Sequence, residues 1–221
     1  MSSLDGLWKA IGQQLAHPSG ICGSLIGYAM AIANRRPNQL AIDALEITPG
    51  DVVLELGFGP GRAIETLASQ ARSGCVFGID RSAAMVAQAS RHNWRTIKSG
   101  HLRLQQGRFD ALPWSTESVD KILAVNVVYF FRADATEVRE ARRVLRPGGV
   151  IAIYATDRSV MEHWKFSSAA THQTYNRDDL ISLLRRGGFD DGEITVAHAN
   201  VGFGVTGLLA LVRKRAAQPY R

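Results

Sequence analysis

The sequence has little cysteine, and its histidines show no metal-ligand spacing. The two cysteines, Cys22 and Cys75, lie far apart, so neither a metal site nor a disulfide framework is expected. Cys75 opens an apolar run and is predicted to be a small core residue rather than a reactive thiol. This cysteine usage fits a reducing compartment, and we expect a cytoplasmic protein.

Long apolar segments are also missing. The longest, from Ile21 to Ala33, is too short to cross a bilayer and contains glycine, serine and tyrosine. The N-terminus lacks a basic region followed by an apolar core, so no signal peptide is predicted. A chain of 221 residues, of which 46% are hydrophobic and 21% charged, fits one compact domain with a buried core.

The sequence also lacks a cluster of basic residues. The net charge is +6, but the basic residues are dispersed in short groups such as Arg35-Arg36, Arg142-Arg143 and Arg185-Arg186. Nucleic-acid-binding proteins more often gather Lys and Arg with interleaved aromatics on one element, so a nucleic-acid partner is not expected. An acidic substrate or peripheral contact with an anionic membrane stays open, and the sequence leaves the oligomeric state undetermined.

From residue 50 onward, short apolar runs alternate with segments of helical periodicity. The predicted strands are 51–56, 75–80, 102–106, 119–125, 150–154, 193–199 and 207–212, and the main helices end near Ala71 or cover 82–92, 135–145 and 177–186. This alternation predicts an α/β fold with a Rossmann-like, doubly wound, seven-stranded and mostly parallel sheet. The last two strands are expected to form an antiparallel hairpin at the sheet edge. Residues 1–48 are interpreted as an N-terminal helical cap or lid, and residues 49–221 as the main domain.

A glycine-rich loop, Gly57-Phe58-Gly59-Pro60-Gly61, joins the first predicted strand to a helix. Such loops bring a ligand against backbone N–H groups. The spacing is shorter than the G-x-G-x-x-G of dinucleotide sites, which disfavours NAD. Glu55 just before the loop would repel a pyrophosphate but suits a positively charged amino group.

Asp80 ends the second predicted strand, where a carboxylate can accept hydrogen bonds from ribose hydroxyls. The alternative is that Asp80 caps the following helix.

Several segments in order carry a family resemblance. They are Val52 to Gly61, Gly78-Ile79-Asp80-Arg81-Ser82, Gly107 to Trp114, Ser118 to Ile122, and Arg143-Val144-Leu145-Arg146-Pro147-Gly148-Gly149. Together they resemble the class I S-adenosylmethionine-dependent methyltransferases, within them the subgroup of ubiquinone- and menaquinone-biosynthesis enzymes. The resemblance implies that S-adenosylmethionine is the cofactor and S-adenosylhomocysteine the product.

The resemblance also implies roles for single residues. Glu55, Gly57, Phe58, Gly59 and Gly61 would line the methionine and ribose, Asp80 the ribose, Arg81 and Ser82 the adenosine, and Asn126 the sulfonium end. Members often carry an aspartate for the adenine amino group where this chain has Arg108. Arg108 cannot accept a hydrogen bond, so Asp110 or Phe109 would have to hold the base.

The methyl acceptor is expected to meet segments outside the cofactor half. Tyr129 in the loop after the fourth strand is the first candidate to face the methyl group, while Phe130 and Phe131 either wall the acceptor or pack against the next helix. His17 stands in a break between N-terminal helices that could close as a lid or form a simple turn.

The sequence offers weaker candidates for the acceptor side. Tyr28, Met30 and Asn34 fall on a helical repeat that could share the lid face, and His163 and His172 are expected to be surface histidines rather than bases.

The sequence leaves three hypotheses for the function. The first is a methyltransferase acting on a small, largely apolar metabolite. The strand-4 sequence Asn126-Val127-Val128-Tyr129 lacks the prolines that the wider family associates with methylation of amide or base nitrogens. The alternatives are a phospholipid head-group N-methyltransferase at a membrane surface and a non-catalytic cofactor-binding regulatory protein.

Overall fold

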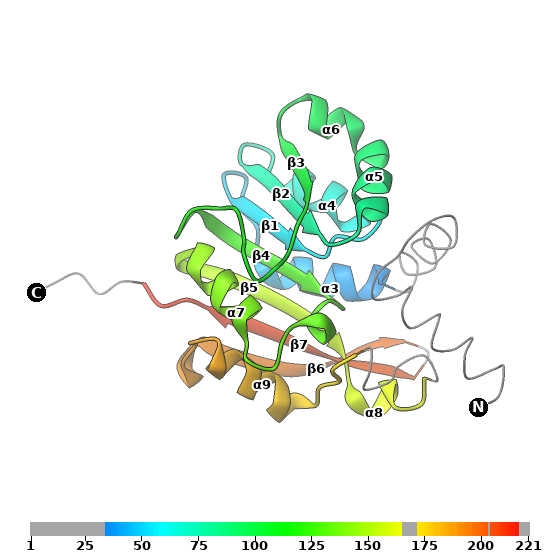
Figure 1. Cartoon of the computed structure of the whole chain (residues 1–221), viewed down its shortest axis with the longest axis vertical. Coiled ribbons are helices and arrows are strands. Elements are labelled where there is room, and N and C mark those ends of the chain that lie inside the picture. The colour runs from blue at the N-terminus through cyan, green and yellow to red at the C-terminus, as the bar shows by residue number, and fades with distance from the viewer. Residues whose placement is uncertain (1–33, 165–171, 203, 217–221) are drawn as a thin grey trace, which may run out of the picture.

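The computed structural model describes residues 34–164, 172–202 and 204–216, which form a seven-stranded sheet with helices on both faces (Figure 1). The strands are β1 (Val52–Leu56), β2 (Cys75–Asp80), β3 (Leu102–Gln106), β4 (Val119–Val125), β5 (Leu145–Thr156), β6 (Ile194–Gly202) and β7 (Val205–Arg213). The α-helices are α3 (Arg35–Leu45), α4 (Arg62–Gln70), α5 (Ala83–His92), α6 (Trp94–Lys98), α7 (Thr136–Val144), α8 (Arg158–Met161) and α9 (Arg177–Arg186). Short 3₁₀ helices cover Val128–Phe130 and Asp191–Glu193.

The strand order is β3-β2-β1-β4-β5-β7-β6. The first five strands are parallel, and β7 pairs antiparallel with both β5 and β6. The predicted Rossmann-like doubly wound fold with an antiparallel C-terminal hairpin is therefore confirmed. In this hairpin the later strand, β7, pairs with β5 and lies inside the sheet, while β6 forms the edge. β7 is an almost unbroken apolar run, and β6 is more polar.

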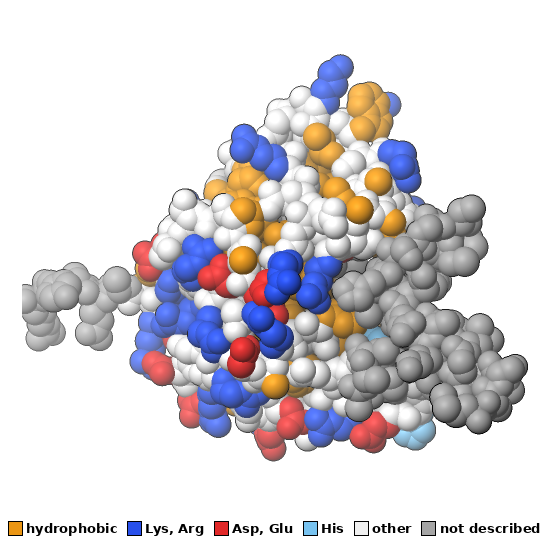
Figure 2. Space-filling model, in the orientation of Figure 1, with side chains coloured by type: hydrophobic (Ala, Val, Ile, Leu, Met, Phe, Trp, Pro, Cys, Tyr) orange, Lys and Arg blue, Asp and Glu red, His pale blue; other side chains and the backbone are white. Residues whose placement is uncertain are grey.

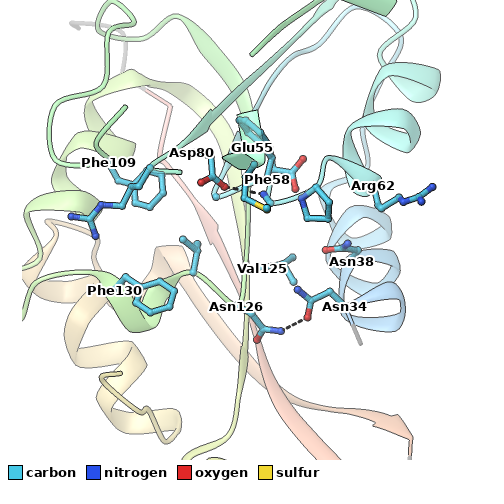
Figure 3. A pocket seen from close by; sticks show the side chains of 16 residues that line it. Asn34, Asn38, Glu55, Phe58, Arg62, Asp80, Phe109, Val125, Asn126 and Phe130 are labelled. Atoms are coloured by element: carbon cyan, nitrogen blue, oxygen red, sulfur yellow. Dashed lines mark hydrogen bonds between the residues drawn. The ribbon is translucent and has the colours of Figure 1, made fainter. Parts of the chain in front are cut away.

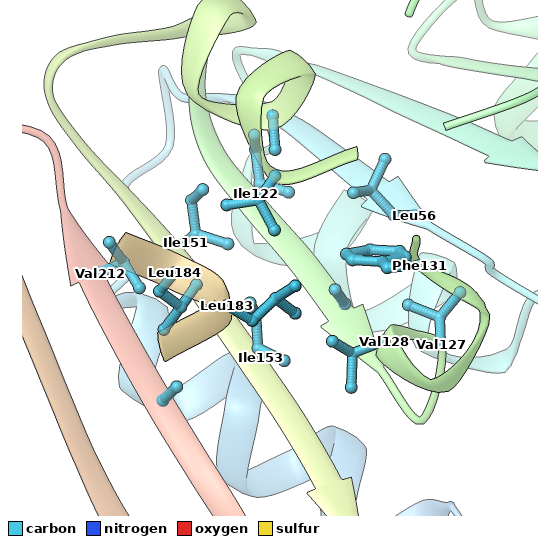
Figure 4. Packing of buried hydrophobic residues seen from close by; sticks show 14 of the residues in the cluster. Leu56, Ile122, Val127, Val128, Phe131, Ile151, Ile153, Leu183, Leu184 and Val212 are labelled. Atoms are coloured by element: carbon cyan, nitrogen blue, oxygen red, sulfur yellow. The ribbon is translucent and has the colours of Figure 1, made fainter. Parts of the chain in front are cut away.

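The sheet separates two buried clusters because successive side chains of a strand point to opposite faces. Ile122 and Ile151 belong to the cluster beneath α7 and α9 (Figure 4). Their neighbours Leu123 and Ala152 belong to the cluster covered by α3, α4 and α5. Because both faces of the central strands are buried, successive residues are apolar whichever face they point to, and these strands appear in the sequence as continuous apolar runs.

Two local predictions are corrected. The fifth strand begins at Leu145 instead of Val150. The predicted turn Arg146–Gly149 lies within it as an irregularity, where the register with β4 shifts between Val119 and Lys121 and Gly148 has φ +81°. Cys75 is half-buried at the start of β2 instead of in the core. Burial still raises the pKa of its thiol, which fits an unreactive cysteine.

The described ranges contain no helix long and apolar enough to cross a membrane, and within them no group of three or more His, Cys, Asp or Glu side chains is arranged to hold a metal ion. The predicted cap, residues 1–48, is described only from Asn34 onward. His17, Tyr28 and Met30 lie outside the described residues.

Candidate functional site

The carboxyl ends of β1, β2 and β4 meet where the strand order reverses, which is where doubly wound sheets bind ligands. A solvent-open cavity of about 740 Å³ lies there, counting its mouth. Its lining is Asn34, Asn38, Glu55, Gly57, Phe58, Gly59, Pro60, Arg62, Asp80, Arg81, Met85, Phe109, Val125, Asn126, Val127 and Phe130. Most of the residues predicted to hold a cofactor are therefore together in one cavity (Figure 3), but Gly61, Ser82 and Asp110 do not line it.

The three glycines of the loop all have φ in the left-handed region, which favours glycine. A Cβ on Gly57 would stand 2.6 Å from Cγ2 of Val127, and one on Gly61 would stand 2.7 Å from Cβ of Ala89. Gly61 thus lets α4 pack closely on α5. A Cβ on Gly59 would meet nothing within 4 Å, so Gly59 is the glycine whose backbone faces open space.

Asp80 connects the glycine loop to β2. Its Oδ2 accepts a hydrogen bond from the Gly59 N–H at 2.9 Å, and its Oδ1 accepts one from the Ser82 N–H at 2.8 Å. The N-cap of α5 is Ser82, whose Oγ accepts from the Met85 N–H. The capping role therefore belongs to Ser82, and Asp80 is left at the cavity wall, although burial raises the pKa of its carboxyl.

Glu55 is a buried carboxyl group, only 4% exposed. Its Oε2 makes no hydrogen bond with any residue of the described ranges. Burial first, and the neighbouring Asp80 second, raise the pKa of Glu55 from 4.5 to about 8. A buried carboxyl with a free oxygen at a cavity wall is suited to receive a cationic group, which would satisfy the oxygen and stabilise its charge.

Asn126 ends β4 in the left-handed region, with φ +53°, and its side chain is held from several sides. Its Nδ2 donates to Asn34 Oδ1 at 2.8 Å (Figure 3), and its Oδ1 accepts from the Tyr129 hydroxyl at 2.7 Å. The backbone N–H of Thr156 also donates to the Tyr129 hydroxyl oxygen. Helix α3 and the ends of β4 and β5 therefore fix one carboxamide at the cavity wall.

Tyr129, expected to face the methyl group, is 6% exposed and does not line the cavity. Burial raises the pKa of its phenol, so it is a hydrogen-bond donor rather than a base. Phe130 lines the cavity, whereas Phe131 is buried beside Phe109. The sequence placed the aromatic group correctly but not its orientation, since the 3₁₀ turn at Val128–Phe130 rotates successive side chains to different sides.

Asp110 is engaged away from the cavity. Arg108 donates two hydrogen bonds to it, and Arg132 forms an ion pair with it at 2.9 Å. The Arg108 hydrogen bonds contribute most to lowering the pKa of Asp110 to about 2. Phe109 does line the cavity, with the Arg81 guanidinium 5.9 Å from its ring centroid.

His172 is buried, 6% exposed, so its prediction as a surface histidine was wrong. Its ring lies 5.2 Å from that of Phe130 and 6.0 Å from that of Tyr129, and burial lowers its pKa. His163 is exposed, as predicted, with Nδ1 2.7 Å from the Ser159 carbonyl oxygen.

Sequence reasoning did not select Asn38, Arg62 or Met85. Asn38 stands four residues after Asn34, the spacing that puts two side chains on one helix face, so this residue could have been found from the helical repeat that includes Asn34. Arg62 and Met85 follow the loop and Asp80 closely in the sequence.

Comparison with known sequences finds methyltransferases among the relatives. Residues 53–149 match the family model described as a methyltransferase domain. The uncharacterized methyltransferase YdaC of Bacillus subtilis is 31% identical over 170 residues, which cover 77% of this chain and 88% of that protein. Erythromycin 3''-O-methyltransferase of Saccharopolyspora erythraea is 30% identical over 116 residues, covering 52% of this chain but only 38% of its own length.

Solved structures share the fold. A chain from the complex between the Haloferax volcanii Trm112 methyltransferase activator and the putative methyltransferase superposes with a TM-score of 0.70, at 20% identity, over 88% of this chain and 95% of that one. Geranyl diphosphate methyltransferase, in complex with GPP and sinefungin, has a TM-score of 0.63 at 14% identity, over 80% of this chain and 76% of that one. At these identities the structures are evidence for the fold alone.

Proposed function

The chain belongs to the class I S-adenosylmethionine-dependent methyltransferases, and from this we propose that the cavity holds the cofactor through Glu55, Asp80 and the glycine loop while the acceptor is a small, largely apolar metabolite. The observation that carries the proposal is the contact of Asp80 with the Gly59 N–H beside the unpaired oxygen of Glu55.

The residues fit the cofactor group by group. Glu55 suits its ammonium and Asp80 its ribose hydroxyls. Phe109 and Arg81 offer an aromatic face and a cation at the end of the cavity beyond Asp80, where the base would lie without a contact from Asp110. Asn38 and Arg62 supply N–H donors suited to its carboxylate.

When bound, S-adenosylmethionine supplies an electrophilic methyl group on a sulfonium. The protein's part is to position the partners and exclude water, and a base is needed only for an acceptor protonated at working pH. Tyr129 acts through Asn126 as a positioning residue, because its hydroxyl fixes the carboxamide. We also propose that residues 1–48 form a cap beside this site, because Asn34, the N-cap of α3, and Asn38 within α3 line the cavity. His17 stays a candidate from this cap.

An apolar acceptor is supported by the wall formed by Val125, Val127 and Phe130, which is continuous with His172 through the Phe130 ring. A small-molecule acceptor is supported by the similarity to erythromycin 3''-O-methyltransferase, which acts on a small molecule. The motif series in residues 50–155 further supports membership of the quinone-biosynthesis subgroup as part of this proposal.

The cofactor site is tested by calorimetry with S-adenosylhomocysteine. Gly59→Val and Asp80→Ala should each weaken binding by at least tenfold, because the first fills the open space beside the loop and the second removes the carboxylate. Arg213→Gln at the far end of β7 is the control and should bind as the wild type does. Unchanged affinity in both site variants would exclude this cavity as the cofactor site.

The acceptor is tested by a thermal-shift screen of apolar and polar metabolites with S-adenosylhomocysteine present, followed by methyl-transfer assays on the hits. Stabilisation and methylation confined to charged, strongly polar compounds would contradict the apolar acceptor.

A further inference from the structure

Residues 81–109 contain six Lys or Arg residues, two histidines and no Asp or Glu. Arg81 lines the cavity and Arg108 pairs with Asp110, but the other four cations belong to one end of the molecule, where α5, α6 and the edge strand β3 meet (Figure 1). Figure 2 shows Lys and Arg side chains and apolar side chains at this end, with no acidic side chain on the visible face. The dispersed charge of the sequence is therefore a basic surface in the folded chain.

Four exposed cations define this surface, here called the α6 corner: Arg91, Arg95, Lys98 and Arg103. None of them forms an ion pair with a residue of the described ranges. Glu65 of α4 lies 3.7 Å from His92 and forms no ion pair with any of the four cations. An uncompensated group of cations at a protruding end attracts an anionic partner.

Helix α6 also carries a large apolar side chain that is exposed to solvent. Trp94 is 53% exposed, the single large hydrophobic side chain found exposed among the described residues, and α6 contains no buried residue. Ile97, one turn later, is half-buried. The Arg95 guanidinium lies 5.4 Å from the Trp94 ring centroid. An amphipathic indole between long basic side chains is the composition of a membrane-water interface anchor.

We propose that the α6 corner is a docking surface for an anionic phospholipid bilayer, in which Trp94 enters the interface and the four cations contact lipid head groups. A bilayer fits better than a nucleic acid, because the corner has one exposed aromatic and Arg95 already occupies one approach to its ring. Nucleic-acid surfaces that bind by stacking present several open rings along a groove.

Docking at this corner leaves the cofactor cavity accessible. Neither Trp94 nor any of the four cations lines the cavity. Asn93, just before α6, donates to the Gly61 carbonyl oxygen at the end of the glycine loop, but the side chains of the corner are exposed to solvent. This surface is separate from the 21–33 segment that the sequence suggested for membrane contact, which lies outside the described residues.

Co-sedimentation of the full-length protein with vesicles tests the proposal. Vesicles of phosphatidylcholine with 30 mol% phosphatidylglycerol should bind the protein at 50 mM salt, and binding should be largely lost at 500 mM salt because the charges are screened. Arg95→Gln combined with Lys98→Gln should weaken binding roughly 25-fold, since each basic residue near an anionic surface contributes roughly fivefold. Trp94→Ala should weaken it roughly tenfold through lost apolar burial.

The matched control is Arg177→Gln combined with Arg213→Gln, which removes the same charge from exposed sites on α9 and β7 and should leave vesicle binding within about twofold of the wild type. The corner variants should keep the wild-type melting temperature and affinity for S-adenosylhomocysteine, because their side chains are exposed and do not line the cavity. The proposal is overturned by absence of vesicle binding at low salt, by equal losses in the control and the corner variants, or by corner variants that lose binding to a single-stranded RNA oligomer but not to vesicles.

Discussion

At the residue scale, the cavity depends on one carboxyl group kept in an unfavourable environment. Glu55 is buried with an unpaired oxygen close to the Asp80 carboxylate. In the unfolded chain this carboxyl ionises near 4.5, whereas in the ligand-free fold burial and Asp80 raise its pKa to about 8. Between these two pH values the unfolded state releases its proton first, so the folded state loses stability as the pH rises.

Glu55→Gln should therefore stabilise the ligand-free protein at neutral pH, by on the order of 3 kcal/mol at pH 7, and by little near pH 4.5. Denaturant unfolding at several pH values measures this difference. Glu65→Gln, an exposed change on α4, should follow the pH dependence of the wild type. A constant offset between Glu55→Gln and the wild type across this range would show that Glu55 is ionised in the free protein.

The same residue predicts proton release when the cofactor or its product binds. At pH 6.5 the Glu55 carboxyl is protonated, because its pKa is about 8, and pairing with the ligand's ammonium favours the ionised form. Binding of S-adenosylhomocysteine should then release up to about one proton. Calorimetry in buffers of different ionisation enthalpy measures the number released. Glu55→Gln should bind more weakly and release none, and an equal release from this variant would assign the proton to another group.

At the scale of elements, the glycine loop combines two separate requirements. Gly61 permits close packing of α4 on α5, whereas Gly59 keeps a ligand-facing stretch of backbone open. Both have positive φ, so any side chain adds strain, but only at Gly61 would a Cβ collide with the core.

Gly61→Ala should accordingly cost about 2 to 4 kcal/mol of stability through strain and overpacking against Ala89. Gly59→Ala should cost only about 1 kcal/mol and act mainly on ligand affinity. Urea unfolding and calorimetry on the same two variants separate these effects. If Gly59→Ala were the more destabilising of the two, the division of roles within the loop would be wrong.

On the scale of the whole molecule, the two buried clusters share the same strands. Ile122 and Leu123 are neighbours on β4, both fully buried, and they point into opposite clusters. Neither cluster can lose its strands without exposing the other, so the described domain should unfold as one unit.

Ile122→Ala and Leu123→Ala should each lower the free energy of unfolding by about 2 to 5 kcal/mol while far-UV circular dichroism and tryptophan fluorescence keep a common midpoint. A midpoint that separates between the two probes in either variant would show that the faces of the sheet unfold independently.

The sequence by itself determined the local elements and the cofactor half of the site. Cys75–Asp80, Leu102–Gln106 and Val119–Val125 were predicted with the bounds that the structure has, because apolar runs and their turn residues are local signals. Glu55, the glycine loop and Asp80 could be placed for the same reason, since each stands at the end of a strand or in the loop that follows.

Only the tertiary structure decided contacts between distant segments. The insertion of β7 inside the sheet, the hydrogen bond from Asn126 to Asn34, the burial of His172 and the basic α6 corner all join or orient residues far apart in the chain. Local propensity carries no information on these, because packing of whole elements selects which faces meet.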